Sequence, residues 1–184
     1  MFRRPNPETP PCPMETTDAA LLLLLADTLA DPSAVESVVL VRPWVLGAVS
    51  GASPHGGFRR RLADAFDLPE PDVARVLATL DDPARWLPAL PGVSLFHVDA
   101  GPRLAGADVG FVRYAAGIDV PWHRHGDEEI MLVLEGSFVE LPRHHVLPGD
   151  VLRSGPGSSH VLRILPGQDC LAAIIVRGGV ALDP

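Results

Sequence analysis

The chain has 184 residues, of which 47% are hydrophobic, so it is long and apolar enough for one good core plus an extension, and a disordered chain is excluded. A formal net charge of -8 and a pI near 5.2 argue against direct nucleic-acid binding, which needs a basic face. Cys12 and Cys170 are the only two cysteines, which argues against a disulfide framework. Cys170 stands in an apolar run and is expected to be a small core residue.

The first segments of the chain read as a tail followed by helix. Residues 1–16 are crowded with proline and are expected to be extended or disordered. An Ala- and Leu-rich helix is predicted from Thr17 to about Ala30, and the valine-rich segment Ser33–Arg42 fits either helix or strand. Residues 47–57, GAVSGASPHGG, read as a flexible linker in which His55 is expected to be solvated.

The Leu21 to Leu25 run has the apolar character of a signal-peptide core. Asp18 and Asp27 bracket it closely, and it is too short to span a membrane. We therefore expect a soluble cytoplasmic protein without a membrane partner.

Two further helices are predicted before residue 86, which completes a helical region over residues 17–85. The first has apolar residues at helical spacing, namely Phe58, Leu62 and Phe66. The second begins near Pro71 and Asp72, and its apolar positions are Val73, Val76, Leu77 and Leu80. The run Arg59 to Arg61 is expected to be a solvated helix face, and a docking surface for an acidic partner is its rival interpretation.

Beyond residue 86 the period of the hydrophobic pattern changes to two and glycine punctuation begins. Short strands are predicted in six segments: VSLFHV, ADVGFVRYAAG, EIMLVLEGSFVEL, HHVLPGDVLRS, HVLRILPG and DCLAAIIVRGG. Apolar residues occupy both faces over 131–134, so that strand is expected to be central. Residues 86–184 are thus predicted to form one mainly β domain, an antiparallel sandwich or barrel.

The chemistry-bearing residues gather in the stretch from Gly117 to Gly136. His123 and His125 are two apart, which on a strand points both imidazoles to the same face. Glu129 keeps the same parity, and Gly126 suggests a bulge or bend that brings this carboxylate round to the histidines. With the more distant His160, these side chains make a ligand set for one divalent metal with open positions. Glu128 is the rival carboxylate, and its parity argues against it.

The spacing of these residues resembles the cupin superfamily. The first cupin motif, G-x5-H-x-H-x3-E-x6-G, is filled without a gap by Gly117, His123, His125, Glu129 and Gly136. The second, G-x5-P-x-G-x2-H-x3-N, is matched by Gly149, Gly157 and His160, with Gly155 replacing the proline and Ile164 the asparagine. The resemblance implies a cupin double-stranded β-helix, or jelly-roll barrel, with an N-terminal α-helical extension. Zinc is the leading metal, and Fe, Mn, Ni or Cu suit the same ligands.

Longer stretches resemble the carboxy-terminal cupin domain of ChrR-type anti-sigma factors. They are WLPALPGV, FVRYAAGIDVPWHRHGDEEIMLVLEGSF, the PGD turn and PGSSH. In that family a helical module wraps an extracytoplasmic-function sigma factor and carries its own zinc site, H-x3-C-x2-C, while the cupin binds a second metal and is implicated in sensing. This chain lacks H-x3-C-x2-C, so only the cupin ligands carry over, and sigma-factor binding is left open.

Other side chains that could approach the pocket are Phe111, Arg113, Tyr114, Trp122, Phe138 and Arg153. Since Arg113 and Tyr114 alternate on one strand, at most one of them faces inward. His144 and His145 are expected to be exposed turn residues, and His97 a surface or edge residue. No catalytic residue is assigned.

The sequence favours a metal-binding sensor or regulator of ChrR type. The alternative is a small metal-dependent cupin oxygenase or isomerase, and a structural or storage role comes third. A pocket lined by Leu, Val, Ile and Phe would favour a small apolar ligand. A homodimer through edge strands is expected by resemblance, since exposed edges favour pairing.

Overall fold

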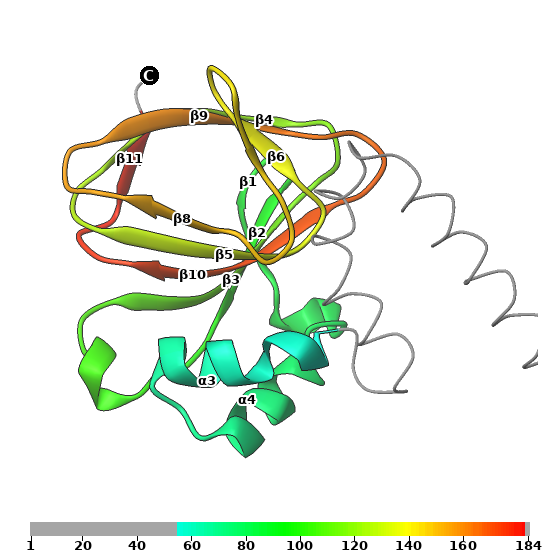
Figure 1. The fold of residues 1–184 in the computed structure, drawn as a ribbon, viewed down its shortest axis with the longest axis vertical. Helices are drawn as coiled ribbons and strands as arrows, with labels where there is room; N and C mark the ends of the chain where they lie inside the picture. The colour runs from blue at the N-terminus through cyan, green and yellow to red at the C-terminus, as the bar shows by residue number, and fades with distance from the viewer. Residues whose placement is uncertain (1–54, 183–184) are drawn as a thin grey trace, which may run out of the picture. The chain divides into compact units, whose positions relative to one another are not determined.

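The structure, a computed structural model, describes residues 55–182. The proline-rich tail, the predicted helix from Thr17 and the segment Ser33–Arg42 lie outside the described residues. The described part is mainly β, with two antiparallel sheets stacked face to face and short helices below one of them (Figure 1). The predicted cupin fold class is confirmed.

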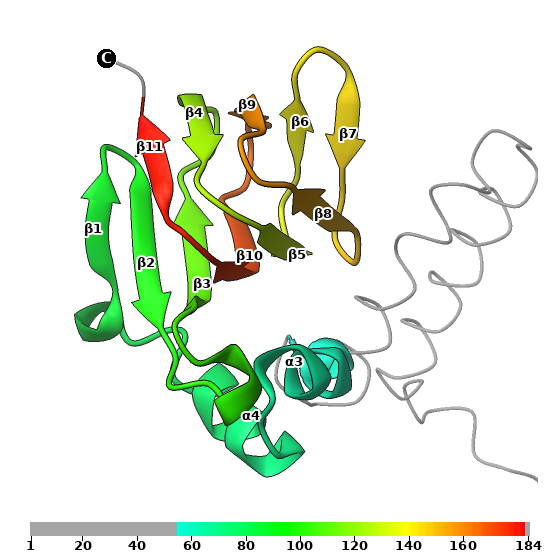
Figure 2. The same cartoon turned by 90° about the vertical axis from the view of Figure 1, so that its left-hand side faces the viewer.

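The two sheets contain eleven strands in the described range. The six-stranded sheet has the order β1 (Leu87–Leu90), β2 (Val93–His97), β3 (Asp108–Tyr114), β10 (Cys170–Val176), β5 (Glu129–Glu135) and β8 (Val151–Ser154). The five-stranded sheet has the order β11 (Val180–Leu182), β4 (Asp119–His125), β9 (Ser159–Ile164), β6 (Phe138–Glu140) and β7 (His144–Val146). Figure 2 shows β1, β2 and β11 at one side of the sandwich and β6, β7 and β8 at the other.

Strand β5 lies between β10 and β8 and is apolar on both faces, as its sequence predicts. Its inward residues, Met131 and Val133, belong to the core between the two sheets. Leu132 and Leu134 instead belong to a second core on the outer face of the six-stranded sheet. Because side chains alternate along a strand, this one segment contributes to both cores.

The helices supply the other half of the outer core. The 3-10 turn η2 (Gly56–Phe58) leads into α3 (Arg59–Phe66), which is followed by α4 (Glu70–Leu77), and both helices cover the six-stranded sheet (Figure 1). Leu62 and Phe66 are buried, as the helical spacing predicts, and Phe66 meets Phe111 edge-to-face at 5.5 Å. Burial of each such side chain contributes about 1.5–3 kcal/mol. The helices therefore share a core with the sheet.

The short turns complete the described chain. Two more 3-10 turns are η3 (Pro83–Arg85) and η4 (Pro102–Leu104). Gly136, predicted at the tight turn after β5, has φ +64°, and a Cβ there would lie 2.4 Å from the Asp169 carbonyl oxygen. Glycine is required because this position combines a left-handed backbone with a close approach.

The structure corrects one prediction and adds two strands. His55 is not solvated but buried, because its Nε2 bonds the Glu135 carboxylate at 2.8 Å. Strands β1 and β11 were not predicted; each has three or four residues and pairs on one side only. Among residues 55–182, none of the helices has the length and apolarity needed to cross a bilayer.

Candidate metal centre

Three histidines meet on the inner face of the five-stranded sheet. His123 and His125 alternate with the exposed Trp122 and Arg124 along β4, so both imidazoles point between the sheets. His160 on β9 is the cross-strand partner of His123. The strand period and the β4–β9 register thus bring together the three histidines that the sequence predicted as ligands.

The ring nitrogens of these histidines converge. The His160 Nε2 lies 2.8 Å from the His123 Nε2 and 3.2 Å from the His125 Nε2. All three side chains are buried, with His125 only 1% exposed. One nitrogen from each ring falls within a sphere small enough for a single ion, so this cluster can hold a metal.

Glu129 reaches the site from the opposite sheet. The chain bends after His125 at the end of β4, and Glu129 begins β5, where it is buried. Its Oε2 lies 3.8 Å from the His125 Nδ1, so it stands beside the three converging histidines without joining their tight cluster. Glu128 faces the other way and bonds Arg153 at 3.4 Å.

Two neighbours fix the orientation of the histidine rings. The His123 Nδ1 donates to the Pro121 carbonyl oxygen at 2.8 Å, and the His160 Nδ1 donates to the Glu140 Oε1 at 2.7 Å. A hydrogen bond at Nδ1 leaves the lone pair on Nε2 and thereby sets the ligating tautomer. Sequence reasoning missed Glu140, since neither cupin motif includes it and only the pairing of β6 with β9 brings it to His160.

The donor set fits a metal ion. In the neutral imidazoles the Nε2 atoms of His123 and His160 both carry lone pairs, and they face each other at 2.8 Å, an arrangement that a cation between them would stabilise. Two nitrogens bound to one zinc lie about 3 to 3.4 Å apart, which is near the observed spacing. The His125 Nδ1 is buried without a hydrogen-bond partner.

Burial favours the neutral form of His123 and His125, the form that metal binding requires. Burial lowers the pKa of His125 to about 4, with the neighbouring His160 and His123 acting in the same direction. Burial also lowers the pKa of His123, although its hydrogen bond to Pro121 opposes this. Burial raises the pKa of Glu129 to about 7.

A cavity of about 370 Å³ opens beside His123 and Glu129. Its walls are mostly Val, Leu and Ile from both sheets, and its remaining ionisable residues are Asp108 and Tyr114. Burial, with a smaller effect of Glu129, raises the pKa of Tyr114 well above its ordinary value. The cavity therefore presents a metal-facing wall and a large apolar surface.

The six residues named as able to approach the pocket lie in different parts of the structure. Tyr114 lines the cavity, whereas Arg113 points outward and lies over the Trp86 ring at 4.3 Å. Trp122 is 43% exposed on the face of β4 opposite the histidines, and Arg153 is exposed on the outer face of its sheet. Phe138 lies in the core between the sheets and Phe111 in the outer core.

The remaining histidines lie away from the three converging histidines. His97, His144 and His145 are exposed, as expected. His144 nevertheless bonds the second oxygen of Glu140 at 2.8 Å, so one carboxylate joins an exposed histidine to a buried one.

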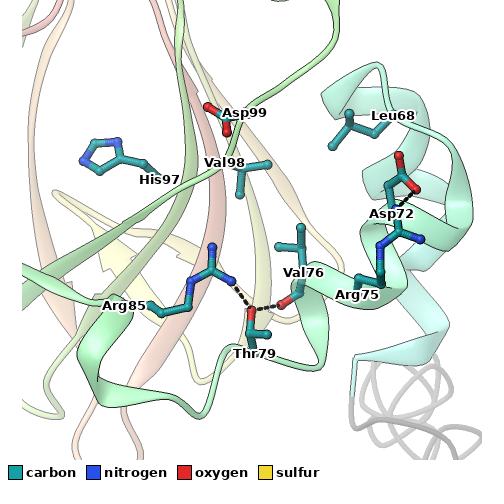
Figure 3. Close-up of a pocket in the computed structure, with 9 residues that line it drawn as sticks. All are labelled: Leu68, Asp72, Arg75, Val76, Thr79, Arg85, His97, Val98 and Asp99. Carbon is teal, nitrogen blue, oxygen red and sulfur yellow. Dashed lines mark hydrogen bonds and ion pairs between the residues drawn. The ribbon is translucent and has the colours of Figure 1, made fainter.

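A second cavity, of about 340 Å³, lies between α4 and the end of β2 (Figure 3). Among its polar side chains, Arg75 pairs with Asp72 at 2.5 Å, and Arg85 donates to the Thr79 hydroxyl at 2.7 Å. Within the described residues, the histidine trio is the group of three or more ligand-type side chains that converges on one point.

The family model that matches this sequence is the ChrR cupin-like domain, over residues 74–178. That match covers more than half of the chain. The chain belongs to the ChrR cupin-like domain family. The resemblance read from the motifs is confirmed, whereas no curated protein matches the chain.

Several solved structures are similar to this ChrR-like cupin. Rhodobacter sphaeroides SigE in complex with the anti-sigma ChrR shows 24% identity over 62% of this chain and 54% of that chain, with a TM-score of 0.48. An RmlC-like cupin protein from Ralstonia eutropha shows 22% identity over 52% and 64%, with a TM-score of 0.46. An acetylacetone dioxygenase from Acinetobacter johnsonii shows 10% identity over 56% and 74%, with a TM-score of 0.48. This chain spans less than two thirds of the first two structures.

Proposed function

We propose that this protein is a metal-dependent sensor or regulator of ChrR type. The observation that supports the proposal most is the convergence of three buried Nε2 atoms, two of them oriented by Pro121 and Glu140. His123, His125 and His160 would hold one divalent metal, with Glu129 as the fourth ligand and zinc as the leading ion. When bound, such an ion supplies a Lewis-acid centre with room for a water or a small ligand.

The signal would enter through the apolar cavity beside His123 and Glu129. Its lining favours a small, mostly apolar molecule over a sugar. An enzyme needs a proton donor or acceptor near its substrate, and apart from the proposed metal ligands the cavity offers two ionisable side chains, Tyr114 and Asp108. This short list favours ligand sensing over turnover.

An extracytoplasmic-function sigma factor is the partner we propose, on the basis of family membership. The region over residues 17–85, which the sequence predicts to be helical, would supply the contact surface without the zinc motif found in ChrR-type proteins. We also propose a homodimer. In its favour, β1 and β11 are sheet edges that carry exposed apolar side chains, including Leu87, Val180 and Leu182.

The second candidate is a small metal-dependent oxygenase or isomerase. The cavity favours it, because a substrate bound there would lie directly against His123 and Glu129. The two functions differ in turnover, and that difference can be measured.

The deciding experiment is elemental analysis of the purified protein beside His123→Ala and His160→Ala, followed by oxygen-uptake assays with enol and thiol substrates. We expect about one metal per chain in the wild type and none in either variant. Zinc without turnover, together with binding of a sigma factor encoded beside the gene, would support the sensor. Iron, manganese, copper or nickel with oxygen uptake lost in His123→Ala would establish the enzyme instead. Full metal content in both variants would refute the site.

A further inference from the structure

A groove on the outer face of the six-stranded sheet combines an apolar floor with a basic rim. It lies beside α3 at the end of the sheet that β8 forms, and its volume is about 280 Å³. The apolar residues are Ala65, Leu104, Ile130, Leu132, Val151 and Ile175. The charged residues are Arg61, Arg153, Arg177 and Glu128.

Strand register builds the floor. Ile130 lies opposite Ile175 on β10 and opposite Arg153 on β8, so one row of the sheet runs from an apolar side chain to a rim arginine. In the next row Leu132 lies opposite Val151. Leu132 is buried, whereas Val151 is 43% exposed on the edge strand. The groove therefore rests on rigid strands and leaves apolar surface open to a partner.

The charge of the groove is opposite to that of the whole protein. The chain carries -8, whereas the three rim arginines against one glutamate leave about +2 locally. Glu128 pairs with Arg153, and the Arg61 Nη1 donates to the Gly149 carbonyl oxygen. Within residues 55–182, the Arg177 side chain forms neither a salt bridge nor a hydrogen bond.

Arginine suits the recognition of carboxylates. The chain has 15 arginines and contains no lysine. The planar guanidinium binds a carboxylate with two parallel hydrogen bonds, and its weak hydration suits it to interfaces. A partner that complements the groove would carry acidic side chains beside an apolar anchor.

We propose that this groove docks an acidic, leucine-bearing helix of a partner protein. Leucine side chains spaced one helical turn apart would fill the space over Ile130 and Val151, and flanking Asp or Glu would meet Arg153 and Arg177. The volume of the groove suits single side chains projecting from the apolar face of a bound helix. The apolar floor and the acidic remainder of the protein disfavour a phosphate backbone.

Docking at this groove would also act on the metal centre, a step that rests on the proposed function. Glu129 points inward between its sheet partners Ser154 and Val176. The adjacent residues along the three strands, Glu128, Ile130, Arg153, Ile175 and Arg177, line the groove on the outer face. Because a strand segment moves as a unit, a helix that shifts this face also shifts the Glu129 carboxylate.

The test is a fluorescence-anisotropy titration of the full-length, metal-free protein with two labelled synthetic helical peptides. Both carry leucines at positions i, i+4 and i+7; one has glutamates on its flanks and the other has lysines. We expect saturable binding of the acidic peptide that weakens with salt, and no binding of the basic one. Two single variants, Arg153→Glu and Arg177→Glu, should each weaken binding of the acidic peptide by about tenfold.

Matched controls separate the groove from overall charge. Arg60→Glu makes the same charge change at an exposed residue of α3 that does not line the groove, so binding should stay within about twofold. Val151→Asp should weaken binding as much as the arginine variants, because it removes the apolar contact. If the acidic peptide fails to bind, or if Arg60→Glu weakens binding equally, the proposal is overturned.

Two further measurements assign the occupant and the coupling. Size-exclusion chromatography tests whether the groove instead binds a second copy of this chain. A concentration-dependent dimer that Arg177→Glu abolishes and Arg60→Glu preserves would show this, and it would overturn the proposal of a partner helix. Saturating acidic peptide should change the Zn²⁺ affinity measured by chelator competition, since coupling is reciprocal. An unchanged affinity would refute the coupling. If the protein bound no metal, the proposed function would fail, but the peptide titration would still test the groove because it uses metal-free protein.

Discussion

His123 and His160 lie directly opposite each other on β4 and β9, with their Nε2 atoms 2.8 Å apart. Each ring already donates from its Nδ1, to Pro121 and to Glu140 respectively. The two facing nitrogens are therefore both acceptors, and the backbone register holds them in that position. The partners at Nδ1 are as much a part of the centre as the ligands.

Removal of Glu140 should weaken metal binding without removing a ligand. Glu140→Ala leaves the His160 ring free to rotate and to change tautomer, so we expect about a 10- to 100-fold loss of Zn²⁺ affinity in chelator competition. Side-chain ¹⁵N spectra of the metal-free protein should show that His160 loses its fixed tautomer. A purely structural effect would leave this signal unchanged.

The control for Glu140 is its exposed partner. His144→Ala removes the hydrogen bond to the other carboxylate oxygen, and its effect on Zn²⁺ affinity should stay within about twofold because the exposed pair is solvent-screened. Wild-type affinity in Glu140→Ala would show that His160 is oriented by its packing alone.

The proposed role of Glu129 as a fourth ligand can be tested with two adjacent carboxylates. Glu129→Gln keeps the size of the side chain but removes its charge, and we expect about a tenfold or greater loss of Zn²⁺ affinity. Glu128→Gln makes the same change on the outer face, where the side chain bonds Arg153, and should leave the affinity unchanged. Equal affinities in both variants would reduce the ligand set to the three histidines.

The sequence predicted those parts of the fold that depend on local pattern. The alternation around His123 and His125 places both rings on one strand face, and two apolar faces over residues 131–134 identify a central strand. The spacing of the motifs also predicted which distant residue, His160, would complete the trio.

The rest depends on relationships between segments that no local pattern carries. Glu140 meets His160 only because β6 pairs with β9, and His55 is buried only because the tertiary fold presents Glu135 to it. The outward orientation of Trp122, by contrast, is a matter of local alternation, because the adjacent His123 points inward. Motif spacing identified the candidate ligands, whereas their hydrogen-bond partners could be found only once the pairing register of the strands was known.

The packing of α3 on the sheet predicts a large effect of Leu62→Ala. Leu62 is fully buried in the outer core, so its truncation should lower the free energy of unfolding by about 2–5 kcal/mol. Urea denaturation measures this loss, and the exposed Arg60→Ala should stay within about 0.5 kcal/mol of wild type. A loss below about 1 kcal/mol would show that the helix is dispensable to the core.

The pair formed by the buried His55 and the half-buried Glu135 predicts an acid-dependent part of the stability. The hydrogen bond from His55 lowers the pKa of Glu135 below its ordinary value of 4.5, against an opposing effect of burial. Because folding lowers this pKa, the ionised carboxylate stabilises the native state above pH 4.5, and that contribution is lost as the pH falls through the depressed value. In Glu135→Gln the contribution is absent, so the stability of the wild type should exceed that of the variant by about 1 kcal/mol near pH 6, and the difference should shrink as the pH falls below 4.5 and through the depressed pKa. Urea denaturation at each pH measures it, and His55→Ala should remove the same acid-dependent component. A double variant whose loss of stability relative to the wild type equals the sum of the two single losses would show that the two side chains act independently.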